Sequence, residues 1–348
     1  MLSKRPRSTD GSTSSLAGKQ ARRRWLAQSN TATPRQWSLL ATYTTRQYCV
    51  QYQESDHAFV TRLLAEEGIF FWFDQPADGA PAAEQLVLGD DPQTYAPISG
   101  DPGLIYRRQV GDGAMSADEH QVIDFRSRTR VESSAVMLHD YDFRRPLLDL
   151  TGKAPADGVP PDPAAVGTGT LLEVYDHHGE YEEPDADAVH ARVYLEQLRA
   201  GVREADARSV CRRLLPGHRF DLADHDVDKL NAGWVVVSVE HHGVSPESAK
   251  PGLRAYENRF RCVPAEVPFR PARPARVLRQ VTESAVVVGP EGQEIFTDTH
   301  GRVKVQFHWD REGQQNAYSS CWMRAAQAWA GTGWGFQFIP RIGGRCTD

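Results

Sequence analysis

Apolar and polar residues alternate strictly over residues 302–309, near the end of the chain. One set of alternate positions is apolar or aromatic: Val303, Val305, Phe307 and Trp309. A period of two is that of a half-buried β-strand, which has one face in the core and the other in solvent. A polar turn over 310–316, a short run over 320–327 and a glycine-rich bend over 331–335 follow. The pattern therefore predicts several short strands in a small barrel or sandwich.

The sequence between residues 48 and 73 predicts a strand, a helix and a second strand. Residues 48–52 alternate with the period of a strand. A helix is expected to begin at Ser55 or Asp56, since either side chain can cap it, and to end at Gly68, which can adopt the left-handed conformation. The run IFFWF at 69–73 is continuously apolar, so we expect a strand that is buried on both faces.

A second helix is expected over residues 185–208, where apolar residues recur at helical spacing. The stripe consists of Ala191, Leu195, Leu198 and Val202. Two later runs, 234–239 and 255–262, have the pattern of strands, and a loop rich in Pro, Gly and Ser joins them. That arrangement predicts an antiparallel pair. Residues 131–150 are expected to form a strand followed by a turn.

Polar and proline-rich segments divide the chain into domains. Residues 1–36 are rich in Ser, Thr, Arg and Lys and have no apolar period, so we expect a disordered basic tail. No apolar stretch follows its basic residues, which argues against a secretory signal peptide. The stretch 264–276, which begins PAEVPFRPARP, is expected to be a stiff linker between a domain at 37–263 and another at 277–348.

Composition and charge limit the possible classes of protein. The 348 residues are 40% hydrophobic and 25% charged, which is ordinary for a globular protein. No apolar run has the length of a membrane helix. The net charge of −6 disfavours a dedicated nucleic-acid binder. The 5 cysteines include no C-x-x-C pair, so the sequence predicts neither a zinc ribbon nor a disulfide framework, and it favours a reducing compartment of synthesis.

Residues that can bind metals gather in three places. In the first, His139, Asp140 and Asp142 are close in sequence, but neighbouring residues of a strand point to opposite faces, so His139 and Asp140 are not expected to share an ion. The second is the segment VYDHHGEYEE, which offers nitrogen and oxygen ligands. Its ligands are Asp176, His177, His178, Glu180, Glu182 and Glu183. The third place is the pair His241 and His242.

None of these groups is interpreted as an active site, because no nucleophile, base and orienting group can be placed together from the sequence. The acidic residues Asp56, Glu66 and Glu67 of the first helix are interpreted as capping or solvated residues. The sequence therefore predicts no catalytic, cofactor-binding or metal-binding residue.

Long motifs link the chain to a known family. The C-terminal motifs are GRVKVQFHWDREG, SSCW, WAGTGWG and PRIG, and YCVQYQESDHAFVTRLLAEEGIFFWF and DYDFRRP precede them. Between these lie RSVCRRLLPGHRF, VVSVEHHG and ENRFRCVPAEVPFRP. In order and spacing, these segments resemble the type VI secretion system spike proteins, the VgrG family. The resemblance extends over residues 37–343.

The resemblance implies a fold of the α+β class that is mainly β. A phage baseplate hub-like β-barrel domain with inserted helices would occupy 37–263, and an incomplete OB-fold barrel would occupy 277–348. The family's first hub barrel is missing before residue 37, and the residues after PRIG depart from the family's closing strand. We therefore expect a chain that is truncated at both ends and a last barrel with an unpaired edge. The segment with His177 and His178 corresponds to an exposed turn of the family with no metal role.

The resemblance also implies a mechanical, non-catalytic function without cofactors. A homotrimeric tip would cap a tube of Hcp protein and deliver effectors together with a spike-tip (PAAR) protein. It would be made in the bacterial cytoplasm and secreted to the extracellular space or a target cell, piercing the target membrane without being integral to it. The apolar stripe of the second helix and exposed aromatic strand edges are expected to form the trimer interface.

Two other functions stay open at this point. An OB-fold surface can bind carbohydrate or single-stranded nucleic acid through stacked aromatic residues, although Phe307 and Trp309 are expected to point inward. A metal-dependent hydrolase would need a metal ion at His177 and His178.

Overall fold

The computed structural model describes residues 34–44, 46, 49–75, 84–108, 120–155, 172–177, 184–245, 256–274, 282–310 and 313–347. They belong to two compact units. The barrel unit contains Thr31–Ala41 and Leu64–Arg273, and the terminal unit contains Thr42–Leu63 and Pro274–Asp348. The division at residue 273 lies within the proline-rich stretch. The expected domain at 37–263 differs from the barrel unit, because the expectation included residues 42–63, which belong to the terminal unit.

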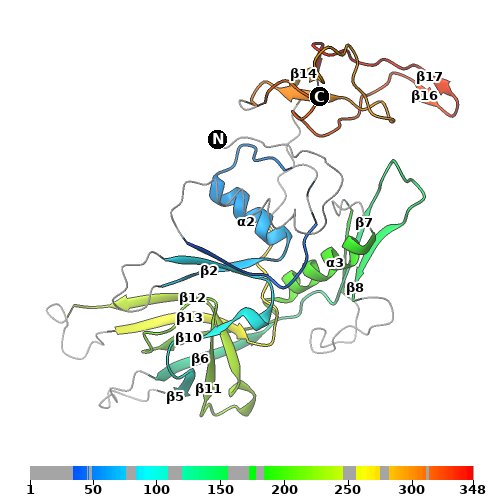
Figure 1. The fold of residues 1–348 in the computed structure, drawn as a ribbon. Coiled ribbons are helices and arrows are strands. Elements are labelled where there is room, and N and C mark those ends of the chain that lie inside the picture. Colours follow the sequence, from blue (N-terminus) through cyan, green and yellow to red (C-terminus); the bar gives the residue numbers. More distant parts are fainter. Residues whose placement is uncertain are drawn as a thin grey trace. The chain divides into compact units, whose positions relative to one another are not determined.

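Figure 1 shows the helices and strands, coloured along the sequence from blue to red. The barrel unit contains β1 (Arg35–Ser38), β2 (Phe70–Asp74), β3 (Gln85–Gly89), β4 (Ala96–Pro97), β5 (Gly103–Tyr106), β6 (Gln121–Thr129), β7 (Ala135–Asp140), β8 (Leu150–Ala154), β9 (Glu173–His177), α3 (Pro184–Arg199), β10 (Arg203–Ser209), β11 (His218–Ala223), β12 (Gly233–Gly243) and β13 (Tyr256–Pro264). Short 3₁₀ turns lie at Pro92–Thr94 and Asp228–Leu230. The terminal unit contains β14 (Ser284–Val288), β15 (Lys304–Phe307), β16 (Ala330–Gly331), β17 (Trp334–Gly335) and β18 (Arg345–Thr347), and α2 (Asp56–Glu66) crosses the division.

A closed barrel of six strands forms the centre of the barrel unit. The order is β12-β13-β10-β6-β5-β11, and β11 also pairs with β12, which closes the sheet. The predicted antiparallel pair of 234–239 and 255–262 is confirmed as β12 and β13. Alternation on β13 buries Phe260 and Cys262 and exposes Arg259 and Arg261, so one face fills the barrel.

A smaller sheet in the order β1-β3-β2 packs beside strands of the barrel. Gly68 has the expected positive φ of 69° after α2, and the strand expected at 69–73 is confirmed as β2. The expectation that both faces of this strand are buried is wrong, because Phe73 is 43% exposed while Phe70 and Trp72 are buried. The expectation of a strand at 48–52 is also wrong for the described residues 49–52, which pair with no strand.

A third sheet, β8-β7-β9, is covered by α3 on one face (Figure 1). Val136 and Leu138 of β7 pack with Ala191 and Leu195 of α3. The stripe of α3 is therefore buried within its own chain, and the expectation that it forms a trimer interface is wrong. The helix ends at Arg199, not at residue 208. Residues 203–208 belong to β10, because the alternation that places Ala205 in the core outweighs local helix propensity.

Arg270 connects parts of the barrel unit that are far apart in sequence. Its Nε donates to Glu196 Oε2 on α3 at 2.7 Å. Its Nη1 donates to the backbone oxygen of Gly68 at 2.7 Å and to that of Asp90 at 2.6 Å. The carboxylate of Asp90 in turn accepts hydrogen bonds at 2.8 Å from the amides of Leu40 and Ala41, just after β1. One buried guanidinium therefore holds α3, the start of β2 and the end of β3 together.

The terminal unit contains a three-stranded sheet in the order β15-β14-β18. The alternation predicted for 302–309 is confirmed at Val303 and Val305, which are buried with Ala285 and Val287 of β14. Strand β18 pairs with β14, so the residues after the PRIG motif do contribute a strand to this sheet. Among the described residues, no helix is long and apolar enough to cross a membrane.

The segment 42–63 is fixed within the terminal unit through one carboxylate. Glu283 accepts a hydrogen bond at 2.6 Å from the hydroxyl of Tyr52 and another at 2.6 Å from Nε1 of Trp309. The rings of Tyr52 and Trp309 meet edge to face with their centroids 5.7 Å apart. Trp309 also stacks on Phe307. These aromatic residues are therefore packed against one another within the unit.

Candidate functional surfaces

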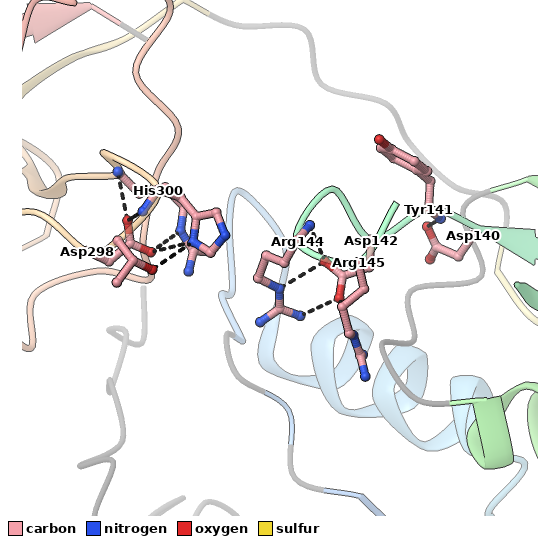
Figure 2. Close-up of polar contacts among 9 residues, drawn as sticks. Asp140, Tyr141, Asp142, Arg144, Arg145, Asp298 and His300 are labelled. Carbon is pink, nitrogen blue, oxygen red and sulfur yellow. Dashed lines mark hydrogen bonds and ion pairs between the residues drawn. The ribbon is translucent and has the colours of Figure 1, made fainter. Parts of the chain in front are cut away.

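The turn after β7 is organised by a buried aspartate. Asp142 accepts hydrogen bonds from the amide and Nε of Arg144, both at 2.9 Å, and from Nη2 at 3.1 Å (Figure 2). Arg145 donates from Nε at 3.0 Å. The hydrogen bonds from Arg144, supported by Arg145, hold the pKa of the Asp142 carboxyl well below its usual range despite burial. Asp142 therefore serves as a structural anchor of the DYDFRRP motif.

Asp140 and His139, which lie close to Asp142 in sequence, do not belong to the cluster of hydrogen bonds around Asp142. Asp140 accepts a hydrogen bond at 2.7 Å from the amide of Tyr141, and Figure 2 shows this contact apart from the Asp142 cluster. His139 instead lies beside His177, with a distance of 3.3 Å between the two Nδ1 atoms. Among the described residues, no group of three or more His, Cys, Asp or Glu side chains is arranged to hold a metal ion.

The parallel pairing of β7 with β9 creates the contact between His139 and His177. The register places these two residues directly opposite each other, while Asp176 lies opposite Leu138, the next position along the strands. The remaining candidates of this segment, His178, Glu180, Glu182 and Glu183, lie outside the described residues.

The pair His241 and His242 lies near the end of β12. His241 Nδ1 is 2.5 Å from the hydroxyl of Tyr256, and burial, together with neighbouring His242, lowers the pKa of His241. His242 Nε2 lies 3.8 Å from Glu240.

At the start of α2, Ser55 accepts a hydrogen bond from the amide of Ala58 at 3.2 Å, as expected of a cap. Glu66 and Glu67, at the end of α2, each have further interactions in the structure.

A second aspartate organises the turn that leads into β15. Asp298 accepts hydrogen bonds from the amides of His300 and Arg302, both at 2.9 Å, and from Nε of Arg302 at 2.6 Å (Figure 2). Burial raises the pKa of Asp298, but the hydrogen bonds from Arg302 and His300 outweigh this effect and lower it. The sequence analysis did not predict this role of Asp298. A signal was present, because an aspartate shortly before a glycine is typical of a turn in which the carboxylate accepts hydrogen bonds from the backbone, and Gly301 has a φ of 68°.

Large apolar side chains gather on the surface near the β16 and β17 hairpin. The aromatic surface, as we call it, consists of Trp329, Trp334, Phe336 and Phe338, which are 60%, 59%, 58% and 69% exposed in the single chain. Trp329 and Trp334 meet edge to face, and Phe336 stacks with Phe338. Exposed apolar groups that lie together indicate an interaction surface.

Two family models match the chain. The phage tail baseplate hub model matches residues 23–247, and the type VI secretion system/phage-baseplate injector OB domain matches residues 295–347. The chain is 39% identical over 318 residues to the type VI secretion system spike protein VgrG4b of Pseudomonas aeruginosa, covering 86% of this chain. This chain belongs to the VgrG family. Its mainly β fold, with a hub-like barrel and an OB-type domain, agrees with the expectation from the sequence.

Other relatives define how far the similarity extends. VgrG1a of Pseudomonas aeruginosa is 35% identical over 317 residues, or 88% of this chain. The actin cross-linking toxin VgrG1 of Vibrio cholerae is 35% identical over 302 residues, or 86% of this chain. The chain spans only 37% of VgrG4b, 46% of VgrG1a and 26% of the toxin.

A solved structure has the same fold. It is the E. coli c3393 protein, described as a component of the type VI secretion system with structural similarity to the T4 bacteriophage tail proteins gp27 and gp5. The TM-score is 0.60 at 18% identity, over 94% of this chain and 66% of that one.

Proposed function

We propose that this chain is the hub and OB portion of a VgrG spike and acts as a non-catalytic, homotrimeric tip. The aromatic surface is the observation that supports assembly, since clustered Trp and Phe side chains are stabilised when a partner covers them. In a homotrimer with threefold symmetry, this surface of one chain would pack against a different surface of the next chain, and the same contact would occur three times. The barrel unit, with its filled core and buried connections, provides a rigid body on which force can act.

The proposed partners follow from membership of the family. The trimer would cap a tube of Hcp protein and carry a spike-tip (PAAR) protein and effectors. Because the proposed role is to pierce a membrane mechanically, it requires no integral segment, and the chain would be exported from the bacterial cytoplasm through the type VI system.

A catalytic role is less well supported. Two of the acidic residues considered in the sequence analysis are bound in structural contacts. Asp142 is bound by Arg144 and Arg145, and Asp56 by the side-chain amide of Gln51 at 2.8 Å. The relative named as an actin cross-linking toxin is matched over only 26% of its length, so its named activity supports no enzymatic role here.

The structure also gives little support to a binding role for the OB-type domain. Phe307 and Trp309 stack on each other, and Trp309 is fixed by Glu283, so neither ring stands free for a base or sugar. The acidic net charge of −6 opposes nucleic-acid binding. Retention of a labelled single-stranded oligonucleotide that weakens with salt would support this alternative.

The mass of the purified chain in solution tests the proposal. We expect light scattering after size exclusion to give three times the chain mass of 38.8 kDa. Trp329→Ser and Phe338→Ser should shift the mass towards that of the monomer, while Leu147→Ser, at a fully exposed position of the barrel unit, should not. A monomer at every concentration would contradict the trimer, and variants that keep the trimeric mass would contradict the aromatic surface as its interface.

A further inference from the structure

Two imidazoles face each other on the open side of the sheet formed by β8, β7 and β9. Alternate residues of β7 point towards α3, where Val136 and Leu138 are buried. His139 directly follows Leu138 on the strand and is therefore on the opposite face, where it is half-buried. His177, on the edge strand β9, is exposed. Solvent can therefore reach the pair.

The register fixes the two residues relative to each other. His139 and His177 are directly paired positions of neighbouring parallel strands. Their rings lie at 24° to each other with centroids 5.3 Å apart, and their closest polar atoms are the two Nδ1 atoms, 3.3 Å apart. The two Nδ1 atoms are therefore close enough to bind one ion together.

This distance matches the spacing of two ligands of one transition metal. Zinc binds imidazole nitrogen at about 2.0–2.1 Å with tetrahedral geometry, which separates two ligand nitrogens by roughly 3.3 Å. The same distance is longer than the value of about 2.9–3.0 Å that is most common for hydrogen bonds from N–H to oxygen. Imidazole is a preferred ligand of zinc, copper and nickel, and either ring nitrogen can serve.

We propose that His139 and His177 form a two-histidine site for a divalent transition metal such as Zn²⁺. The metal would connect the edge strand β9 to the central strand β7. Its expected role is to stabilise this edge of the sheet, because an ion bound only by the folded state shifts the folding equilibrium towards that state. No chemical step is required of it.

Titration calorimetry of the untagged chain with Zn²⁺ alone tests the site. We expect one ion per chain, and an affinity at least roughly tenfold weaker in His139→Asn and in His177→Asn, because each substitution removes one of two ligands. His242→Asn, another exposed histidine at a strand end, is the matched control and should bind like wild type.

A second measurement separates a shared ion from a hydrogen-bonded pair. Zn²⁺ should raise the unfolding temperature of the wild-type chain, by about 5 °C near 100 times the dissociation constant, and should leave the doubly substituted chain unchanged. Equal binding by wild type and both single variants would overturn the proposal. So would a wild-type chain with no zinc response, which would leave the contact as a hydrogen-bonded pair only.

Discussion

Removal of the Arg270 side chain is expected to destabilise the barrel unit strongly. The guanidinium is buried, with a side-chain exposure of 9%, and makes three short hydrogen bonds. Arg270→Ala would leave the backbone oxygens of Gly68 and Asp90 without this donor, and an unsatisfied buried acceptor costs about 1–3 kcal/mol. It would also leave Glu196 without its partner, but this carboxylate is 22% exposed and would be partly hydrated.

We therefore expect Arg270→Ala to reduce the free energy of unfolding by about 3 kcal/mol, at the lower end of the cost of breaking a buried ion pair. Arg270→Lys should recover only part of this loss, because an ammonium group lacks the planar fork that reaches a carboxylate and two carbonyl oxygens together. Urea unfolding followed by tryptophan fluorescence measures both values, since Trp72 and Trp234 are buried in this unit.

A matched control uses the same carboxylate. Arg192 lies 3.8 Å from Glu196 across one turn of α3, but its side chain is 60% exposed. Arg192→Gln should therefore cost less than about 0.5 kcal/mol, as exposed helical ion pairs do. The reasoning is refuted if Arg270→Ala costs under about 1 kcal/mol, or if both substitutions have the same effect.

Three further predictions concern other positions. Gly217→Ala should lower the free energy of unfolding in urea by about 2 kcal/mol or more, because φ is 80° and a Cβ would come within 2.5 Å of the Trp72 ring. Gly100→Ala is the control: its φ is 75°, but a Cβ there would meet only the end of a flexible side chain, so the loss should be about half as large. Equal losses would contradict the clash. The hydrogen bonds from Arg144 and Arg145 lower the pKa of Asp142, so they contribute stability that is complete above the unfolded pKa of about 3.9 and is lost as pH falls towards the folded value. Asp142→Asn should therefore flatten the acid limb of a plot of the urea midpoint against pH, and an unchanged limb would argue against this account. Glu283→Ala should speed amide hydrogen exchange in residues 49–63 by at least about fivefold, because the loss of a hydrogen bond worth about 1 kcal/mol changes an equilibrium by that ratio. Unchanged exchange would show that Glu283 does not fix this segment.

Local patterns predicted only some of the strands, among them β2, β7, β12, β13 and β15, and the starts of the two described helices. They rarely showed which strands become neighbours. The pair β12 and β13 was predictable because one loop joins them and both alternate. Strand β10 was not, because Glu204, Asp206 and Arg208 are compatible with a helix, and only pairing with β6 and β13 selects the strand. Closure of the barrel likewise depends on pairings between segments that are distant in sequence.

The same limit explains the outcome for the candidate sites. Sequence alternation correctly placed His139 and Asp140 on a strand, which is confirmed as β7. It gave no reason to bring His139 next to His177, because that contact requires β9 to pair in parallel with β7 at one register. The anchoring role of Asp142 was also hidden, since nothing in the order of residues shows that two neighbouring arginines fold back onto one carboxylate.

The polar side chains of this chain are used mainly to fix its own backbone. Arg270 joins three segments, Asp142 and Asp298 each close a turn, and Glu283 joins two aromatic rings. Such contacts resist deformation, because breaking any of them exposes a partly buried charge or an unsatisfied carbonyl. A metal ion between His139 and His177 would extend this principle to the edge strand β9. Units that are each made rigid in this way would suit the mechanical role proposed above, in which force passes through the fold and an apolar surface binds the partners.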